Sequence, residues 1–289
     1  MISIVIPTHN RPESLKKAVE SVLAQTYKDI EIIVIDDGIE QRAEDVIKEI
    51  NDSRITYIQH QISRGGGAGR NTGIKASKGD FIAFLDDDDE WFPEKLEIQM
   101  QAFEETPADV GFCFTAVENI YNDCRKATRV SDGIDNYLNL LLEYFSGFLN
   151  VTLVIKKSVF DNVGLFDEDF PSHQETDLLI RIMQKYKGLG INKPLVHVNM
   201  HKGHSLMIPF RRIKGREMIL EKHAELFEAR PVSFARQIFG LGLMYRDSGD
   251  FKKAQLAFKK AMSMFFRFRY LMHYVSMIFS GKIYSVFKE

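Results

Sequence analysis

The chain has 289 residues, of which 45% are hydrophobic and 27% are charged, and its formal net charge at pH 7 is -2. This length suffices for one large domain with an appendage, and the balanced charge excludes nucleic-acid binding through overall composition. The two cysteines show no metal-ligand spacing and exclude a disulfide framework, which favours a reducing compartment. Met1 leads into a strand-like run rather than a signal peptide, and we expect no membrane-spanning helix. We therefore expect a cytoplasmic protein.

The first part of the chain alternates strand-like and helix-like segments. Apolar runs at 2–6 and 30–35 predict buried strands, and apolar residues at helical spacing predict a helix over 15–23. We expect the first strand to end at Pro7. A helix over 42–50 and a third strand at 55–58 complete a β-α-β-α-β order. This order predicts an α/β fold with a parallel sheet and right-handed crossovers.

A glycine-rich stretch follows at 63–71. Its four glycines would let the backbone approach a phosphate or adopt positive φ angles. It is not a Walker A loop, since no Gly-Lys-Ser/Thr follows, and a Rossmann fingerprint would instead follow the first strand. A mobile linker and a ligand loop both remain open at this point. A helix over 71–76 is expected to follow.

Four consecutive acids, Asp86 to Asp89, directly follow the apolar strand-like run at 81–85. Two unit charges about 4 Å apart repel by roughly 4 kcal/mol at the effective dielectric of a protein surface. A divalent cation with oxygen ligands would offset this repulsion, and the carboxyl ends of strands are where open α/β sheets bind ligands. The alternative is an acidic turn before the helix that begins near Pro93.

Four segments of the chain together resemble glycosyltransferase family 2. They are Ile4–Arg11 (IVIPTHNR), Ile35–Gly38 (IDDG), Gly69–Ile74 (GRNTGI) and Phe84–Asp89 (FLDDDD), in the family's order. The resemblance continues more weakly to about residue 205. It implies a GT-A fold, which is Rossmann-like with a mostly parallel sheet flanked by helices. It also implies inverting transfer of a sugar from a nucleotide-sugar.

This resemblance divides the chain into parts. A catalytic GT-A domain would cover 1–207, with a nucleotide-binding half at 1–110 and an acceptor half at 111–207. A helical C-terminal region would cover 208–289.

The resemblance also assigns residues to the nucleotide pocket. It places Pro7, Thr8 and Asn10 along the nucleotide. His9 would either lie beside the base or be an ordinary loop histidine.

Further nucleotide contacts are expected from two aspartates and two arginines. Asp37 would contact the edge of the base, with Asp36 in support, and a carboxylate suits a ring N–H of uracil. Arg70 is favoured to face the nucleotide or its phosphates, and Arg64 is the alternative.

The acidic run matches the metal motif of the family. Asp86 and Asp88 are the preferred Mn²⁺ or Mg²⁺ ligands, and Asp87 with Asp89 is the other register. Asp86 and Asp87 are also expected beside the bound nucleotide. His201, in a His-x-x-x-Ser stretch, would close over the diphosphate or metal, or would be an ordinary loop histidine.

The catalytic base is expected on a later helix. The family's Glu-Asp pair falls here on Gln174-Glu175, so the base position is Glu175. Asp177 is the runner-up, and its alternative role is to cap the helix that runs through Arg181.

The C-terminal region reads as helical. The stretch 234–264 resembles one tetratricopeptide-type hairpin. From Lys252 onward there are eight basic residues and one acid, a net charge of +7, which leaves about -9 on the preceding residues. Aromatic and basic residues mix over 265–289, which is typical of a helix lying on an anionic membrane. The alternative is packing on the catalytic domain or on a second subunit in a homodimer.

These features predict a metal-dependent inverting glycosyltransferase that builds surface polysaccharide. Its donor would be a nucleotide-sugar, with UDP expected, and its acceptor a hydroxyl of a glycan or lipid-linked glycan. Such an enzyme would lie in the cytoplasm, at the inner face of the membrane. The alternative is a nucleotide-sugar-binding or scaffold protein of the same fold without turnover. A nucleotidyltransferase is disfavoured, because no glycine-rich basic loop follows the first strand.

Overall fold

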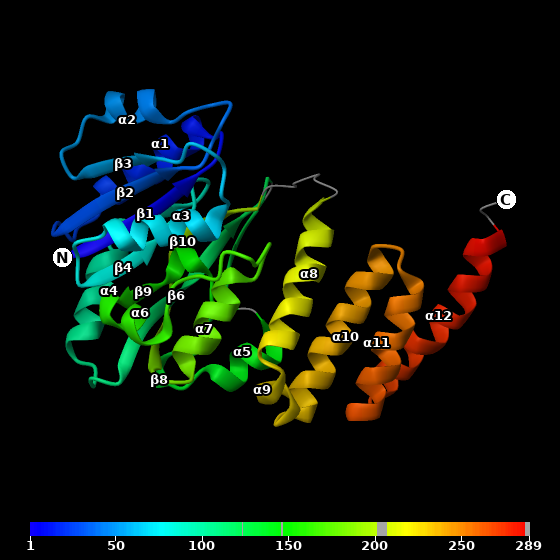
Figure 1. Ribbon diagram of the computed structural model, residues 1–289. Helices are drawn as coiled ribbons and strands as arrows, with labels where there is room; N and C mark the ends of the chain where they lie inside the picture. Colours follow the sequence, from blue (N-terminus) through cyan, green and yellow to red (C-terminus); the bar gives the residue numbers. More distant parts are fainter. Residues whose placement is uncertain (123, 146, 201–206, 287–289) are drawn as a thin grey trace. The chain divides into compact units, whose positions relative to one another are not determined.

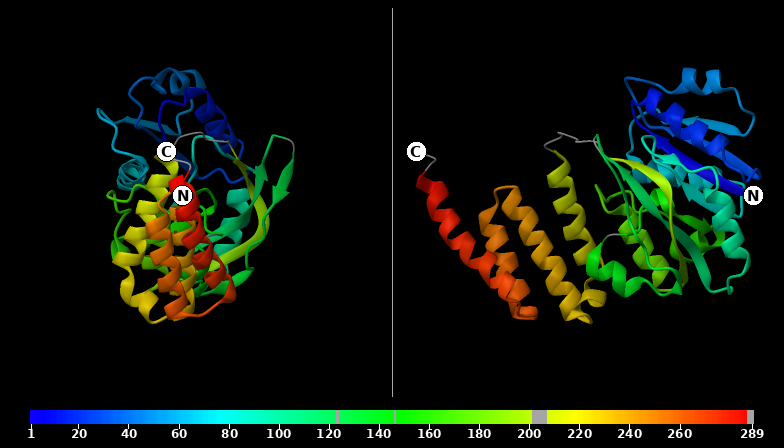
Figure 2. Two further views of the ribbon diagram at one scale, coloured as in Figure 1. Left: turned by 90° about the vertical axis from the view of Figure 1, so that its right-hand side faces the viewer. Right: turned by 180° about the vertical axis from the view of Figure 1, so that it is seen from behind.

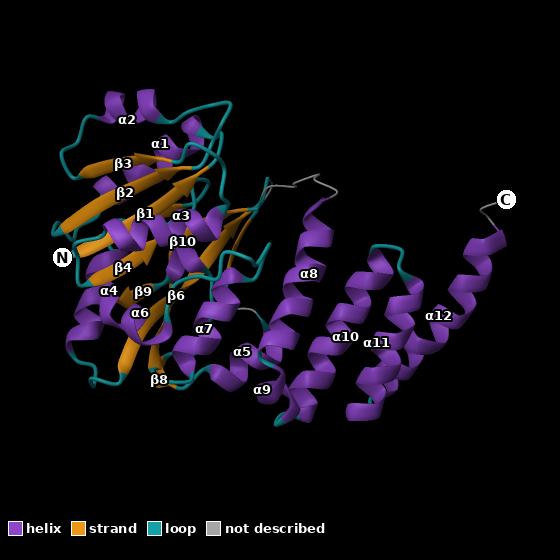
Figure 3. Cartoon of the chain, viewed as in Figure 1, coloured by secondary structure: helices purple, strands orange, loops and turns teal. Residues whose placement is uncertain are grey.

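The computed structural model describes residues 1–122, 124–145, 147–200 and 207–286. Contacts along the chain divide it into two compact units. The sheet unit comprises 1–137, 146–168 and 177–202, and the helical unit comprises 138–145, 169–176 and 203–289. Every described strand belongs to the sheet unit (Figure 3).

The sheet unit is built on one ten-stranded sheet, whose main path runs in the order β3-β2-β1-β4-β9-β6-β10-β5 (Figure 1). The strands are β1 (Ile2–Thr8), β2 (Ile30–Asp36), β3 (Ile55–Gln59), β4 (Phe81–Phe84), β5 (Glu90–Trp91), β6 (Val110–Ile120), β7 (Arg125–Ala127), β8 (Gly133–Asp135), β9 (Val154–Lys156) and β10 (Lys187–Asn199). The strands from β3 to β4 are parallel, as expected from the β-α-β order. Beyond β4 the sheet is mixed, because β9 is antiparallel to both β4 and β6 while β10 is parallel to β6.

Helices cover this sheet because its central strands are apolar on both faces. All seven residues of β2 are buried, as in other sheets covered on both sides. The helices and the 3₁₀ turn described for the sheet unit are α1 (Pro12–Leu23), α2 (Glu44–Ile50), α3 (Gly66–Ala76), α4 (Lys95–Glu104), η1 (Asn150–Thr152) and α6 (Lys157–Val163). In α1 the buried residues Leu15, Ala18, Val19 and Val22 form one helical face. A further helix, α7 (Gln174–Met183), contributes residues to both units.

The glycine-rich stretch corrects one expectation. The helix expected from residue 71 begins at Gly66, so most of these glycines are helical rather than part of a loop. The reason is packing against β1: a Cβ at Gly73 would lie 2.3 Å from Val5 Cγ1, and one at Gly69 would lie 3.3 Å from Pro7 Cβ. Glycine therefore lets α3 lie directly on the first strand, which brings its side chains to the carboxyl end of β1.

The first strand also extends beyond its expected end at Pro7. It continues to Thr8 and pairs with β2 throughout. Val5 accepts a hydrogen bond from Leu85 on the β4 side, and Pro7 faces that same side two residues later. Since the β4 register ends at the Val5–Phe84 pair, the missing N–H of proline breaks no bond of the ladder.

The helical unit contains α5 (Leu138–Tyr144), α8 (Met207–Lys222), α9 (Ala224–Glu228), α10 (Pro231–Asp247), α11 (Phe251–Met264) and α12 (Phe268–Val286). Helices α10, α11 and α12 lie side by side (Figure 2). The hairpin expected over 234–264 is confirmed as α10 and α11. Gly249, at φ +85°, makes its turn, and the Asp250 side chain caps α11 by accepting the Lys253 N–H at 3.0 Å. Within the described residues no helix is both long and apolar enough to cross a bilayer.

Candidate active site

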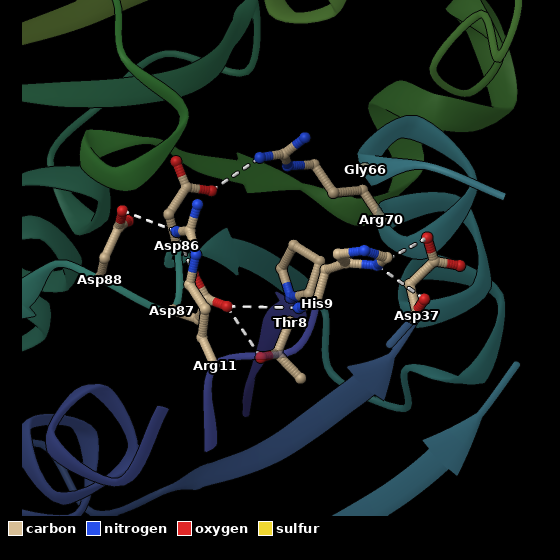
Figure 4. Close-up of a pocket in the computed structure, with 10 residues that line it drawn as sticks. Thr8, His9, Arg11, Asp37, Gly66, Arg70, Asp86, Asp87 and Asp88 are labelled. Carbon is tan, nitrogen blue, oxygen red and sulfur yellow. Dashed lines mark hydrogen bonds and ion pairs between the residues drawn. The ribbon is translucent and has the colours of Figure 1, made fainter. Parts of the chain in front are cut away.

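A pocket of about 360 Å³ lies in the sheet unit, where the parallel strands β2, β1 and β4 end. Ten residues line it (Figure 4): Pro7, Thr8, His9, Arg11, Asp37, Gly66, Arg70, Asp86, Asp87 and Asp88. They come from the last two residues of β1, from the segments that follow β1, β2 and β4, and from the first turns of α3. Eight of the expected site residues thus share one cavity at the sheet edge where α/β proteins bind ligands.

Asp87 points inward and joins the acidic turn to the end of β1. Its buried carboxylate accepts hydrogen bonds from Thr8 Oγ1 at 2.8 Å and from the His9 N–H at 3.3 Å. Arg11 Nη1 lies 3.1 Å from Asp87 and 2.8 Å from Asp88, so it bridges two acids. Burial raises the pKa of Asp87, and the Thr8 hydrogen bond and the Arg11 charge oppose this rise only in part. Asp87 therefore acts within the fold to hold two strand ends together.

Asp86 and Asp88 are the solvent-facing members of the acidic run. Their side chains are 38% and 25% exposed, and Arg70 pairs with Asp86 at 2.6 Å. The fourth acid, Asp89, is buried and accepts the Asn199 N–H at 2.9 Å. Burial first, and then repulsion from Asp86, raise the pKa of Asp89 to about 8. The turn thus concentrates negative charge that its two arginines offset only in part.

This donor set fits a divalent cation. Asp86 and Asp88 present carboxylate oxygens to the pocket, whereas Asp87 is turned inward and Asp89 is not among the lining residues. Across the described ranges no group of three or more His, Cys, Asp or Glu side chains forms a metal cage. A cation held by two carboxylates takes its other ligands from water or substrate phosphates, as Mg²⁺ commonly does. The geometry therefore favours the register Asp86 and Asp88.

Asp37 lines the pocket, but its own chain already saturates its carboxylate. Its oxygens accept from the His60 ring Nδ1, the Ser63 hydroxyl and the N–H groups of Arg64 and Gly65, all at 2.8 Å. Burial alone would raise the pKa of Asp37, but hydrogen bonds led by the Arg64 N–H and His60 lower it overall. Because an ionised carboxylate offers about four acceptor positions, none is left for a base edge unless one of these bonds is exchanged.

Three expected nucleotide contacts have other partners in this structure. Asn10 has a backbone φ of +56°, and its side-chain oxygen accepts hydrogen bonds from the N–H groups of residues 39–41 at 2.9–3.1 Å. Asp36 is fully buried and accepts from the Tyr57 hydroxyl at 2.6 Å and from two backbone N–H groups. Arg64 pairs with Glu168 at 3.1 Å. None of the three is among the residues that line the pocket.

The structure adds residues that the sequence did not single out. Arg11 stands in the first motif, yet only its bridge to Asp87 and Asp88 reveals a role in the pocket. Gly66 lines the cavity at the start of α3. His60 gives no signal in the sequence, since it follows an ordinary strand. His9 donates from Nδ1 to the Asp37 backbone oxygen at 2.8 Å, which ties two of the loops together.

The two candidate bases lie on α7. Asp177 is fully buried and pairs with Arg181 at 2.8 Å, and Arg181 also donates to the backbone oxygens of Val163 and Leu165. Asp177 lies inside the helix, which begins at Gln174, and does not cap it. Glu175 is in the first turn and is partly exposed. His201, the third expected metal ligand, lies outside the described residues.

The fold and the pocket define an α/β protein with a ligand site at the carboxyl ends of parallel strands, lined by acids and arginines. Residues 3–164 match the family model described as Glycosyl transferase family 2, and the chain belongs to this family. It is accordingly a glycosyltransferase, and the fold expected from the motifs is confirmed.

Curated relatives with named activities cover part of the chain. One is the Escherichia coli UDP-Glc:alpha-D-GlcNAc-diphosphoundecaprenol beta-1,3-glucosyltransferase WfaP, which is 41% identical over 36% of this chain and 41% of its own length. Another is the Campylobacter jejuni GalNAc(5)-diNAcBac-PP-undecaprenol beta-1,3-glucosyltransferase, 33% identical over 61% of this chain and 57% of its own. The chain thus spans about half the length of these two relatives.

Solved structures of low sequence identity share the fold. Staphylococcus aureus TarS in complex with UDP-GlcNAc superposes with a TM-score of 0.64 at 16% identity, over 96% of this chain and 79% of that one. The mannosyltransferase PcManGT from Pyrobaculum calidifontis, in complex with GDP-Man and Mn²⁺, superposes with a TM-score of 0.63 at 12% identity, over 99% and 80%.

Proposed function

We propose that this glycosyltransferase moves a sugar, with inversion, from a UDP-sugar to a hydroxyl of a glycan carried on a lipid diphosphate. The main support for this proposal is that two acid–arginine pairs lie in one pocket: Asp86 pairs with Arg70, and Asp88 pairs with Arg11. A site built in this way offers carboxylates to a cation and guanidinium groups to phosphates. These are the two partners that a nucleoside diphosphate requires.

The donor diphosphate lies between the two arginines in this proposal. When it binds, Arg70 and Arg11 would turn from the carboxylates to phosphate oxygens. Asp86 and Asp88 would hold Mn²⁺ or Mg²⁺, which would supply neutralising charge for the departing nucleoside diphosphate. Asp87 keeps its inward bonds to Thr8 and His9 and maintains the shape of the turn.

The uridine is assigned to the space beside His9 and Asp37. Asp37 acts mainly by holding residues 63–65 at the pocket wall, because its four acceptor positions are used. Asn10 and Asp36 do not contact the uridine in this proposal; each instead fixes the backbone that follows β2.

Glu175 is the proposed general base that takes the proton of the acceptor hydroxyl. Its partial exposure supports this role. Asp177 is a weaker candidate, because its fully buried carboxylate is committed to Arg181. In the proposed reaction the acceptor oxygen attacks the anomeric carbon in a single displacement, and the nucleoside diphosphate leaves.

The acceptor class is proposed from the relatives, whose names specify glycans on diphosphate-linked undecaprenol. Synthesis of a surface polysaccharide and a peripheral position at the inner membrane face follow as parts of the same proposal. Exposed Phe266 and Phe268 flank Arg267 where α12 begins, which suits contact between the start of 265–289 and an anionic lipid surface. The catalytic part proposed from the motifs is 1–207, followed by a helical region, 208–289.

The test is thermal stability of the full chain with UDP, GDP, dTDP or CDP, each with Mn²⁺ or with EDTA. A ligand that binds only the folded state stabilises it by about 2.7 kcal/mol at a hundredfold excess over Kd. We expect a rise in Tm with UDP that requires Mn²⁺ and disappears in Asp88→Ala. No shift with any nucleotide at millimolar concentration would contradict the donor site.

A second measurement separates the enzyme from a binding protein without turnover. Release of UDP from UDP-glucose or UDP-GlcNAc, with and without a lipid-linked acceptor, is followed for the unaltered chain and for Glu175→Gln. Loss of transfer with retained UDP binding is expected of Glu175→Gln. Unchanged transfer would refute the assignment of the base.

A further inference from the structure

Within the helical unit, α8 carries a guanidinium that has no counter-ion among the described residues. Arg216 packs against α10 at Gly240, where an added Cβ would lie 2.4 Å from Arg216 Nη1. The Cζ atom of Arg216 lies 5.2 Å from the centre of the Phe145 ring. Its Nε is buried and has no hydrogen-bond partner in the part of the chain that the structure describes. Among the described residues no carboxylate pairs with it.

Such a group is unfavourable for the fold alone. Burial lowers the pKa of Arg216 to about 10, which reports the loss of solvation around its charge. A buried charge normally has a partner, because desolvation of an unpaired ion is costly. Neighbouring contacts do not depend on this charge, since the Tyr245 hydroxyl already joins α10 to Glu217 of α8. The position of Arg216 therefore points to a ligand rather than to stability.

Two further basic side chains accompany Arg216. Arg212 lies one turn earlier on the same face of α8, at the i, i+4 spacing. Burial, followed by the charges of Arg216 and Arg212, lowers the pKa of His173 to about 4, so this imidazole is neutral at pH 7. A neutral imidazole donates one N–H, and the two guanidinium groups supply several more.

The segment that carries His173 is pressed against α8. The Ser172 hydroxyl donates to the Arg211 backbone oxygen at 3.0 Å, and a Cβ at Gly215 would lie 2.4 Å from Ser172 Oγ. His173 and Phe145 both have positive φ, at +61° and +50°, and their rings are 5.8 Å apart. Two strained non-glycine residues thus meet beside the unpaired guanidinium, as is common at functional sites.

We propose that Arg212, Arg216 and His173 form an anion site that binds the diphosphate of the lipid-linked acceptor. This inference rests on the proposed function, which supplies the acceptor class. The shared chemistry is a diphosphate, and its two sources in the reaction are the acceptor and the nucleotide donor. We assign the acceptor, because Arg70 and Arg11 already serve the donor in the pocket of the sheet unit.

The test is isothermal titration of the full chain with farnesyl diphosphate, farnesol and UDP, all in the presence of Mn²⁺. We expect farnesyl diphosphate to bind the unaltered chain at least tenfold more tightly than farnesol. Arg216→Gln should weaken farnesyl diphosphate binding at least tenfold and leave UDP affinity within twofold. Lys214→Gln is the matched control, because it removes the same charge from an exposed position two residues earlier on α8. It should change neither affinity by more than twofold.

Three results would overturn the inference. They are equal binding of farnesol and farnesyl diphosphate, equal effects of Arg216→Gln and Lys214→Gln, or an equal loss of UDP and farnesyl diphosphate affinity in Arg216→Gln. The third result would assign the cluster to the donor. Failure of the unaltered chain to bind UDP would instead contradict the proposed function, so the two failures are distinguishable.

Thermal unfolding of Arg216→Met separates a ligand site from a structural arginine. A ligand site predicts an unchanged or higher Tm together with lost farnesyl diphosphate binding, because an unpaired buried charge has been removed. A lower Tm with unchanged farnesyl diphosphate binding would show that the arginine serves the fold and would refute the site.

Discussion

Asp37→Asn tests whether this carboxylate holds the loop at 60–65. The side chain is 6% exposed and accepts four hydrogen bonds of 2.8 Å. Asparagine keeps one acceptor oxygen but places an amide N–H₂ against donors such as the Gly65 N–H. The substitution therefore removes the charge and about half of the bonds.

The expected loss of stability follows from the exposure of the donors. A hydrogen bond to a charged group contributes about 1.5–3 kcal/mol net. His60 is buried, whereas Ser63, Arg64 and Gly65 are exposed. Water can therefore replace much of the hydrogen bonding that these three residues lose in Asp37→Asn. We expect a loss of about 2–3 kcal/mol in the free energy of unfolding, which corresponds to a fall of roughly 5–10 °C in Tm.

The assay is urea denaturation at pH 7, with Asp45→Asn as the matched control. Asp45 is an exposed carboxylate on α2, and its loss should change stability by less than about 0.5 kcal/mol. A difference of that small size for Asp37→Asn would refute the reasoning.

The pH dependence gives an independent check. The pKa of Asp37 in the folded protein lies below its ordinary value of 3.8. The stabilisation is therefore complete above the unfolded-state pKa and is lost as the pH falls through the folded-state pKa. The gap between the unaltered chain and Asp37→Asn should stay constant from pH 8 to pH 5 and narrow only below about pH 4. A gap that already narrows between pH 7 and pH 5 would assign the effect to another group.

Three further predictions concern other parts of the sheet unit. Burial lowers the pKa of Lys95 to about 7, so the unaltered protein gains stability as the pH rises from 7 towards 10. The gain is at most about 1.4 kcal/mol per pH unit, and Lys95→Met should abolish it in thermal unfolding at pH 6 to 10. A gain that persists in Lys95→Met would disprove the role of Lys95. Gly73→Ala should lose about 1–3 kcal/mol in urea denaturation because its Cβ meets Val5, and Val5→Ala should restore part of that loss. Failure of the second change to help would argue against this contact. Arg70→Gln should weaken UDP binding in calorimetry about 10- to 100-fold, because it removes a charged hydrogen bond. Arg54→Gln, the control, breaks an ion pair outside the pocket and should leave UDP binding unchanged. Equal effects of the two would contradict the role of Arg70.

The parts of the fold that were predictable from the sequence depend on local patterns. Runs such as 30–35 are apolar without alternation, and they form buried strands because helices cover both faces of the sheet. The carboxyl ends of parallel strands converge, so the acids after β2 and β4 were expected at one edge, and Asp37 and Asp86 do line one pocket.

Features that the sequence did not predict depend on contacts between distant segments. Four glycines in nine residues indicated a loop, yet three of them lie in α3, where Gly69 and the later Gly73 leave room for side chains of β1. The pairing of β10 with β6 joins residues about eighty positions apart, and no local pattern specifies it. The bridge from Arg11 to Asp87 spans 76 positions and is equally hidden.

The acids at the strand ends show why composition alone could not assign roles in the pocket. Asp36, Asp37 and Asp87 look equivalent to Asp86 and Asp88 in the sequence, but their oxygens are taken by N–H and O–H groups of neighbouring loops. A carboxylate with saturated acceptors stabilises the loop that donates to it, whereas a carboxylate paired mainly with an arginine side chain can exchange that partner for a cation. Asp87, through its bonds to Thr8 and His9, therefore fixes the turn from which Asp86 and Asp88 face the pocket and pair with Arg70 and Arg11.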